Sequence, residues 1–137
     1  MHKLFSRTLV VVLFSVSGAL AQSIDGGRGE LPLTVPSSYT ADSPAPLIVL
    51  LHTYGRTGAI QDEYMSLSDL ADAYGFIMVA PDGTPSDAQN NPRFWNASAA
   101  CCNWSGKELN DSAYLSDIVD LIKNQYTIDP KRVYIIG

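Results

Sequence analysis

Cysteine, histidine and basic residues are all scarce in this chain of 137 residues, and each scarcity excludes a class of function. With only two cysteines and two histidines, no group of these residues has the spacing of a metal site, so we expect no metal. Nine lysines and arginines stand against fourteen aspartates and glutamates, which gives a net charge of −5. Because no basic cluster follows residue 21, nucleic acid and anionic membranes are not expected as partners.

The first 21 residues have the composition of a secretory signal peptide. Lys3 and Arg7 give a positive start, residues 9–16 are mostly apolar, and Ala19-Leu20-Ala21 is an A-x-A cleavage site. The apolar stretch is too short to be an ordinary membrane anchor, which favours cleavage over an uncleaved anchor. The mature chain would begin at Gln22 with a net charge of −7. We therefore expect a secreted protein, extracellular or periplasmic, without a membrane partner after signal cleavage.

The two cysteines, Cys101 and Cys102, are adjacent in the sequence. A secreted protein is expected to contain disulfides, but a bridge between neighbours closes a strained ring. We therefore expect at least one of the two to pair with a cysteine outside these 137 residues. The alternatives are a vicinal disulfide and two free thiols packed as small hydrophobic groups.

Three short apolar runs predict buried strands, at residues 47–51, 76–80 and 132–136. They do not alternate with polar residues, which is typical of strands buried on both faces of a parallel sheet. Residues 31–35 do alternate, and Pro32 favours a place at the edge of the sheet. Residues 22–30 are predicted to be a turn-rich lead-in, and residues 128–130 a turn.

Two segments between these strands have helical spacing. The apolar face of the first, residues 60–74, would consist of Met65, Leu67, Leu70, Ala71 and Tyr74, and Gly75 would end it. The second would begin at Asn110 or Asp111 and end near Tyr126, with an apolar stripe of Tyr114, Ile118, Leu121 and Ile122. Residues 84–109 are predicted to be a long loop. The alternation of strands and helices predicts an α/β fold with a mostly parallel sheet and helices on both faces.

The last predicted strand is among the most apolar, although the sheet would be thin. An apolar strand with an open edge invites pairing, either with a partner chain or with further strands of its own domain. We favour the second alternative, in which residues 22–137 are the N-terminal portion of a larger domain. The strand closes on Gly137, as a buried strand does when it enters a sharp turn.

Candidate functional residues follow the first buried strand, since open α/β sheets bind ligands at the carboxyl ends of their strands. His52, Thr53, Tyr54 and Gly55 form a glycine-containing loop there. In an acyl-transfer enzyme such a loop supplies a backbone N–H to the oxyanion hole, and the N–H of Tyr54 is the best candidate. The pattern His-x-x-Gly is weak by itself, because glycine is common in strand-to-helix loops.

His52 is the only histidine after residue 21, so a role as general base has to be weighed. In the α/β-hydrolase order of nucleophile, acid and histidine, His52 comes too early, and we expect its imidazole to hold the loop by hydrogen bonds. The carboxylates Asp82, Asp111, Asp117 and Asp120 are expected to cap helices or to lie on the surface. The aromatic residues Trp95, Trp104 and Tyr54 are expected to cover the core rather than to line a substrate cleft.

Several stretches taken together resemble a known family. They are residues 46–52, 54–55, 74–76, 79–83, 94–97, 101–103, 110–115 and 129–134. They are similar to secreted polyhydroxybutyrate-depolymerase-like esterases, which include feruloyl and related plant-polymer esterases. The resemblance extends over about residues 31–137, and the Trp-Asn, Cys-Cys and Asp-Pro-Lys-Arg-Val-Tyr stretches are its more specific parts.

The resemblance implies an α/β-hydrolase fold, of which this chain would be the N-terminal part, truncated at the strand before the nucleophile elbow. It implies a Ser-His-Asp triad whose serine lies in a Gly-x-Ser-x-Gly-Gly-like elbow that begins at Gly137. No catalytic residue would then lie within the chain, and the chain itself would be inactive. The resemblance also implies ester hydrolysis without metal or organic cofactor, and a disulfide from the Cys101 and Cys102 pair to a later cysteine. Thr53 departs from the family, which usually has glycine there.

We therefore expect the full-length parent to be a secreted serine esterase that hydrolyses a polyester or a plant-polymer ester through an acyl-enzyme. Two alternatives remain open. One is a non-catalytic secreted binding module, and the other is a peptidase or another acyl hydrolase of the same fold. The sequence leaves the ester and the oligomeric state undetermined.

Overall fold

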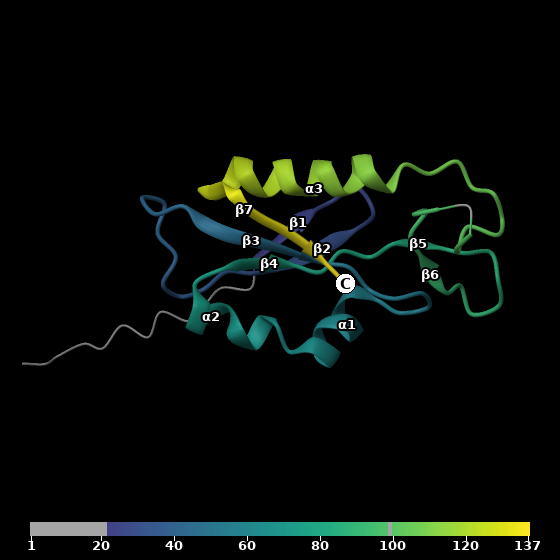
Figure 1. Ribbon diagram of the computed structural model, residues 1–137, viewed down its shortest axis with the longest axis horizontal. Coiled ribbons are helices and arrows are strands. Elements are labelled where there is room, and N and C mark those ends of the chain that lie inside the picture. The colour runs from purple at the N-terminus through teal and green to yellow at the C-terminus, as the bar shows by residue number, and fades with distance from the viewer. Residues whose placement is uncertain (1–21, 99) are drawn as a thin grey trace, which may run out of the picture.

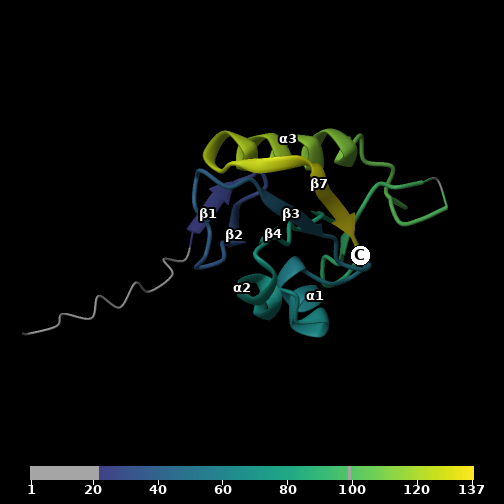
Figure 2. The ribbon, with the colours of Figure 1, turned by 60° about the vertical axis from the view of Figure 1, so that its left-hand side comes forward.

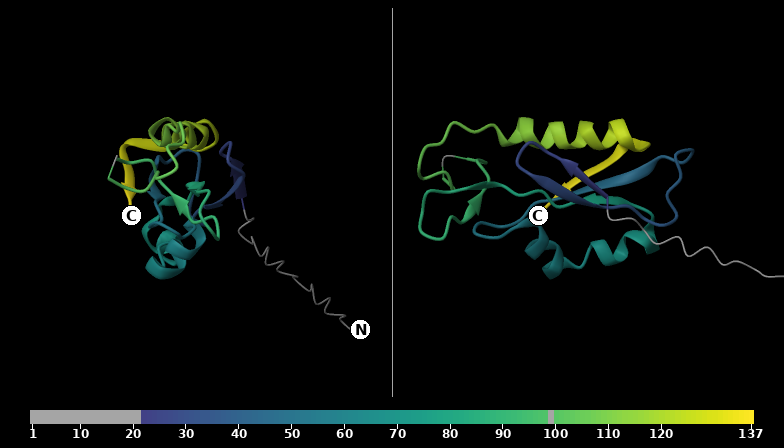
Figure 3. Two further views of the ribbon diagram at one scale, coloured as in Figure 1. Left: turned by 90° about the vertical axis from the view of Figure 1, so that its right-hand side faces the viewer. Right: turned by 180° about the vertical axis from the view of Figure 1, so that it is seen from behind.

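The computed structural model describes residues 22–98 and 100–137, so the predicted signal peptide lies outside the described residues. The elements are β1 (Gln22–Asp25), β2 (Glu30–Thr34), β3 (Ala45–Leu50), α1 (Gly58–Met65), η1 (Ser68–Leu70), α2 (Ala71–Tyr74), β4 (Ile77–Val79), β5 (Thr84–Pro85), β6 (Arg93–Phe94), α3 (Asp111–Gln125) and β7 (Ile128–Ile136). The main sheet lies between α3 on one face and α1 and α2 on the other (Figure 1). The end-on view in Figure 3 shows the same three layers.

The five strands of the main sheet follow the order β1-β2-β4-β3-β7, with β1 and β7 at opposite edges (Figure 2). The pairs of β3 with β4 and with β7 are parallel, and β2 runs antiparallel to both β1 and β4. The architecture is therefore mixed α/β, with the predicted parallel pairing at its centre. No helix in residues 22–98 and 100–137 combines the length and the apolar character that crossing a membrane requires.

Strand β3 is the most enclosed element of the sheet. Leu47, Val49 and Leu50 are fully buried, and so are Ile77 and Val79 of the neighbouring β4. Their side chains enter two clusters, because the strand has a helical layer on each face. The prediction of buried strands in these two segments is confirmed.

The predicted edges of the sheet are wrong. Residues 22–25, expected to belong to a lead-in, form the edge strand β1, which pairs Ser23 with Pro32 of β2. Strand β2 therefore lies inside the sheet. Proline is accommodated there even though it cannot donate a hydrogen bond to a neighbouring strand.

Strand β7 is the other edge and has no buried residue, contrary to the prediction of a third buried strand. It also begins at Ile128, inside the segment expected to be a turn. Its pairing with β3 slips between the partners of Ala45 and Leu47, which are Ile128 and Val133. Pro130 lies within this irregular stretch, where its missing N–H does not interrupt a regular ladder.

The single helix expected over residues 60–74 is broken in two. Ser66 has a left-handed backbone with φ of 51°, and the residues after it form η1 and α2. The carboxylate of Asp62 stabilises the break, because its Oδ1 accepts from the N–H of Ser68 at 3.0 Å. Because the helix is broken at Ser66, only Ala71 of the expected apolar face is buried, and the side chain of Tyr74 is 72% exposed. Gly75 does end α2 in a left-handed conformation, as predicted.

Helix α3 agrees with its prediction. The side chain of Asn110 is the N-cap and accepts from the N–H of Ala113 at 3.0 Å. Tyr114, Ile118 and Ile122 are buried against the sheet, with Val119 beside them. The long loop before α3 contains a short hairpin of β5 and β6, which pairs Thr84 with Phe94.

The full burial of Ile118 gives a direct test of how α3 packs. Replacing it by alanine should lower the free energy of unfolding by about 2–5 kcal/mol, because the residual cavity adds to the lost transfer energy. Urea denaturation followed by circular dichroism measures the change. Asp117→Ala on the exposed side of the same helix is the control and should change stability by less than about 0.5 kcal/mol. Equal effects of the two substitutions would contradict the placement of α3.

Candidate functional site

The carboxyl ends of β3 and β7 lie side by side at one edge of the sheet. The N–H of Leu51, one residue beyond β3, donates to the carbonyl of Ile136 at the end of β7 at 2.7 Å, which continues the parallel pairing. At Gly137 an added Cβ would come within 2.7 Å of the carbonyl oxygen of Leu51. Glycine therefore permits the two backbones to approach each other at the point where both strands leave the sheet.

The loop after β3 is held by the imidazole of His52, which is only 3% exposed. The N–H of Gly83 donates to Nε2 at 2.8 Å, so Nε2 is an acceptor. The proton is then on Nδ1, which donates to the carbonyl of Thr53 at 2.8 Å. Both ring nitrogens are thus engaged: Nδ1 within the loop that follows β3, and Nε2 with the loop that follows β4.

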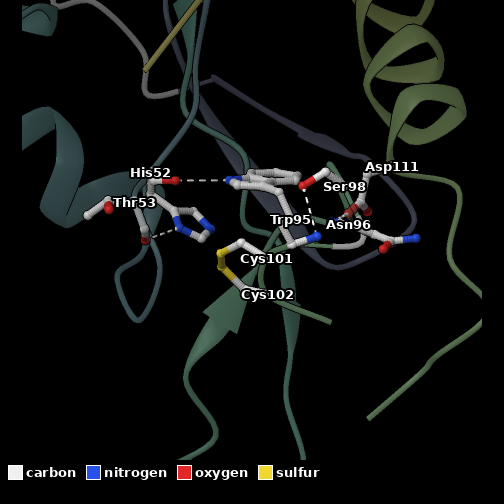
Figure 4. The surroundings of a disulfide bond; sticks show 9 residues. His52, Thr53, Trp95, Asn96, Ser98, Cys101, Cys102 and Asp111 are labelled. Carbon is white, nitrogen blue, oxygen red and sulfur yellow. Dashed lines mark hydrogen bonds between the residues drawn. A yellow bond between two sulfur atoms is a disulfide. The ribbon is translucent and has the colours of Figure 1, made fainter. Parts of the chain in front are cut away.

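The indole of Trp95 completes this support. Its Nε1–H donates to the carbonyl of His52 at 3.0 Å, and the two rings lie 5.0 Å apart (Figure 4). The other side of the indole stacks on Tyr114 and packs against the core. Trp95 therefore covers the core, as expected.

Among the next four residues of the loop, 53–56, one backbone N–H has no acceptor among the described residues. The N–H of Gly55 donates to the carbonyl of Arg93 at 2.8 Å, and that of Arg56 donates to the carbonyl of Thr53 at 3.1 Å. The N–H of Thr53 donates to Oε1 of Gln61 at 3.3 Å. For the N–H of Tyr54, no acceptor is found in residues 22–98 and 100–137. The loop thus presents the donor that the sequence singled out, between neighbours whose own donors are engaged.

Thr53 and Gly55 differ in the backbone that they need. Gly55 has φ of 78°, a conformation that glycine adopts without a steric penalty. Thr53 is not among the residues with positive φ, so its branched side chain fits the loop, and that side chain is exposed. The departure from glycine at residue 53 therefore causes no backbone strain of this kind.

A second set of polar contacts, which the sequence did not reveal, fixes the loop after β4. Oδ1 of Asp82 accepts from the N–H of Gly58 at the start of α1 at 2.7 Å, and Oδ2 pairs with Nε of Arg93 at 3.2 Å. Nη1 of Arg93 also donates to the carbonyl of Gly83 at 2.9 Å. At Gly83 an added Cβ would collide with the carbonyl of Phe94, so the position requires glycine. The Pro-Asp-Gly run was the feature of the sequence that could have predicted a fixed loop here.

Asp111 is not the surface or capping residue that we expected. It is 6% exposed, and its Oδ1 pairs with Nη2 of Arg28 at 2.6 Å. Its Oδ2 accepts from the N–H of Asn96 at 2.5 Å. The guanidinium of Arg28 also lies 3.8 Å above the ring of Tyr114. Asp117 and Asp120 are exposed on α3, as expected.

Burial raises the pKa of the Tyr114 hydroxyl above its ordinary value. The positive charge of Arg28 opposes this rise, and the carboxylates of Asp82 and Asp111 add to it. The neutral phenol is thus the form that the folded chain stabilises.

Cys101 and Cys102 are joined to each other by a disulfide, below His52 and Trp95 in Figure 4. The structure thus has the vicinal pair that was one of the alternatives, and a partner cysteine outside these 137 residues stays a prediction. The two residues lie in a tight turn next to the bridge between Ser98 and Cys101, and the sequence contains no third cysteine.

No group of three His, Cys, Asp or Glu side chains placed to hold a metal is found in the described part of the chain.

Trp104 does not cover the core, contrary to the prediction. Its side chain is 71% exposed, and its ring meets the ring of Tyr54 edge to face with centroids 5.1 Å apart. Tyr54 is itself 38% exposed. The exposed pair belongs to the surface beside the unused N–H of Tyr54.

Comparison with known proteins finds low-identity similarity to two ester hydrolases. No protein-family model matches the chain. It is 31% identical over 139 residues to poly(3-hydroxyalkanoate) depolymerase C of Paucimonas lemoignei, an alignment that covers 98% of this chain and 32% of that protein. It is 28% identical over 112 residues to a bifunctional acetylxylan esterase/xylanase of Neocallimastix patriciarum, covering 82% of this chain and 14% of that protein. The chain thus spans a third or less of the length of these curated relatives, and it resembles ester hydrolases at low identity.

Replacing His52 tests whether its imidazole holds the loop. The variant His52→Phe keeps a ring but leaves the buried N–H of Gly83 without an acceptor, which should lower the free energy of unfolding by about 1–3 kcal/mol. Urea denaturation measures the loss, and Tyr74→Phe, an exposed ring on α2, is the control. A His52→Phe variant as stable as the parent would show that these hydrogen bonds do not support the fold.

The raised pKa of Tyr114 predicts how stability depends on alkaline pH. Because the folded pKa lies above that of the unfolded chain, the contribution is fully present below about pH 10 and is lost as the pH rises through the folded value. Tyr114→Phe should reduce the alkaline loss of stability and should remove a late step from the ultraviolet titration of tyrosinate. Tyr64→Phe, at an exposed position, should instead remove an ordinary step. Two identical titration curves would contradict the burial of Tyr114.

Proposed function

We propose that residues 22–137 form the N-terminal portion of an α/β-hydrolase domain in a secreted serine esterase. The observation that carries the proposal is the unused N–H of Tyr54 in the loop that follows β3, whose carboxyl end lies beside that of β7. In this fold the oxyanion hole takes one N–H from the loop after β3 and the other from the residue that follows the nucleophile. The similarity to an esterase and to a depolymerase, although at low identity, supports ester hydrolysis as the reaction.

In the proposed mechanism the nucleophilic serine belongs to an elbow that begins at Gly137. Its Oγ attacks the carbonyl carbon of the ester while a histidine takes the Oγ proton, and the carbonyl oxygen becomes an oxyanion. The N–H of Tyr54 stabilises that charge without reorganisation, because hydrogen bonds already fix both of its neighbours in the loop. The alcohol leaves with the proton from the histidine, and water then hydrolyses the acyl-enzyme.

The close approach at Gly137 supports this assignment. A nucleophile elbow needs a sharp turn directly after its strand, and the backbone contact with Leu51 leaves no room for a side chain there. His52 acts in this proposal only as a positioning residue, because both of its ring nitrogens are already engaged. The general base and the acid come from a part of the polypeptide that follows the elbow.

The proposed substrate is the ester of a polymer, acted on outside the cell. The names of the two relatives are those of a depolymerase and an acetylxylan esterase, and both refer to polymers. The signal-like composition of residues 1–21 supports secretion. By this proposal the 137-residue chain alone has no ester-hydrolysing activity.

The decisive experiment removes the N–H of Tyr54 in a polypeptide that extends through the elbow. Tyr54→Pro deletes the donor and should lower kcat for a p-nitrophenyl ester about a hundredfold to a thousandfold. Tyr54→Phe keeps the donor and removes only the hydroxyl, so it is the matched control and should keep most of the activity.

Two results would refute the proposal. One is a Tyr54→Pro variant that melts like the parent and hydrolyses the ester at the parental rate. The other is turnover by the 137-residue chain that a serine-reactive phosphonate abolishes, because a nucleophile would then lie within residues 22–137.

A further inference from the structure

Tyr54 and Trp104 are two large aromatic residues exposed beside the proposed oxyanion donor. Their rings meet edge to face, and the indole is 71% exposed, although burying it would be favourable. The pair joins the loop after β3 to the loop before α3. Exposed aromatic surface next to a candidate active site is typical of a ligand-binding surface.

The surface beside the indole is polar. A cavity of about 260 Å³ adjoins Trp104, and its other lining residues are Ser86, Asp87, Ala88, Cys102 and Ser105. Asp87 is mostly exposed, and its Oδ1 pairs with Nζ of Lys107 at 2.9 Å. Two hydroxyls and a carboxylate therefore border an aromatic face.

This combination of groups suits a sugar better than an aliphatic polyester. The C–H face of a pyranose ring packs on the negative face of an indole, and the hydroxyls at its rim donate to carboxylate and serine oxygens. A polyester chain offers only ester oxygens, which accept hydrogen bonds. Oδ2 of Asp87, which takes no part in the ion pair with Lys107, would therefore gain no donor from a polyester, whereas a sugar hydroxyl could donate to it.

We propose that Tyr54 and Trp104 form an aromatic platform that binds the sugar ring of a carbohydrate ester, with Asp87 as an acceptor for its hydroxyls. This inference rests on the proposed function, since it names the substrate class of the same site. Tyr54 contributes to both parts, its ring to the platform and its N–H to the oxyanion.

Affinity electrophoresis of the full chain in gels that contain soluble xylan or hydroxyethylcellulose tests the platform without any need for catalysis. The polysaccharide should retard the parent chain. Trp104→Ala should weaken that binding about tenfold, whereas Trp104→Phe, which keeps an aromatic face, should retain most of it. Tyr74→Ala removes an aromatic ring of similar exposure on α2 and should leave the binding unchanged. Matching thermal melts of the variants exclude misfolding as the cause.

The alternative substrate is a second arm of the same experiment, in which the chain is sedimented with amorphous poly(3-hydroxybutyrate) granules. Sedimentation that depends on Trp104 without retardation by either polysaccharide would overturn the inference in favour of a polyester. Equal retardation of the parent and Trp104→Ala would overturn it as well. Failure of the proposed function is a separate result, because loss of ester hydrolysis in the extended polypeptide would leave the gel retardation unchanged.

Discussion

The burial of β3 is the constraint on which the rest of the structure depends. A strand enclosed on both faces must satisfy its backbone groups laterally, so β4 and β7 both pair with it in parallel. Their carboxyl ends consequently meet at one edge, together with the loop that contains Tyr54. His52, the first residue of that loop, is buried with the strand, and its Nε2 holds the N–H of Gly83 in the loop after β4. The candidate site is therefore fixed mainly by backbone pairing and by one neutral imidazole.

The parts of the fold that the sequence predicted depend on neighbouring residues. Strands β3 and β4 were predicted because burial on both faces gives a continuous apolar run, and α3 was predicted because burial on one face gives apolar residues at helical spacing. The N-cap at Asn110 and the left-handed Gly75 were found because each needs a particular residue type. Tyr54 was identified by its place after a buried strand, which is again a local property.

The parts that the sequence did not predict leave no pattern of apolar residues. The break at Ser66 depends on hydrogen bonds to Asp62, which are local but do not alter the helical spacing of the apolar residues around them. The ion pair of Asp82 with Arg93 and the exposure of Trp104 result from how two long loops fold against each other. Strand β7 has the composition of a buried strand, and only the strand order of the sheet places it at an edge.

The ion pair of Arg28 with Asp111 has a consequence for the order of folding. The two residues are separated by 83 positions, so forming the pair closes a long loop at an entropic penalty. The parallel pair of β3 and β4 and the helix α3 form from residues that are closer to one another in the sequence. The ion pair can therefore form only once α3 and the hairpin of β1 and β2 are both in place. The same hairpin lies at an edge of the sheet and outside the parallel pairs of β3, so its detachment would leave those parallel pairs intact.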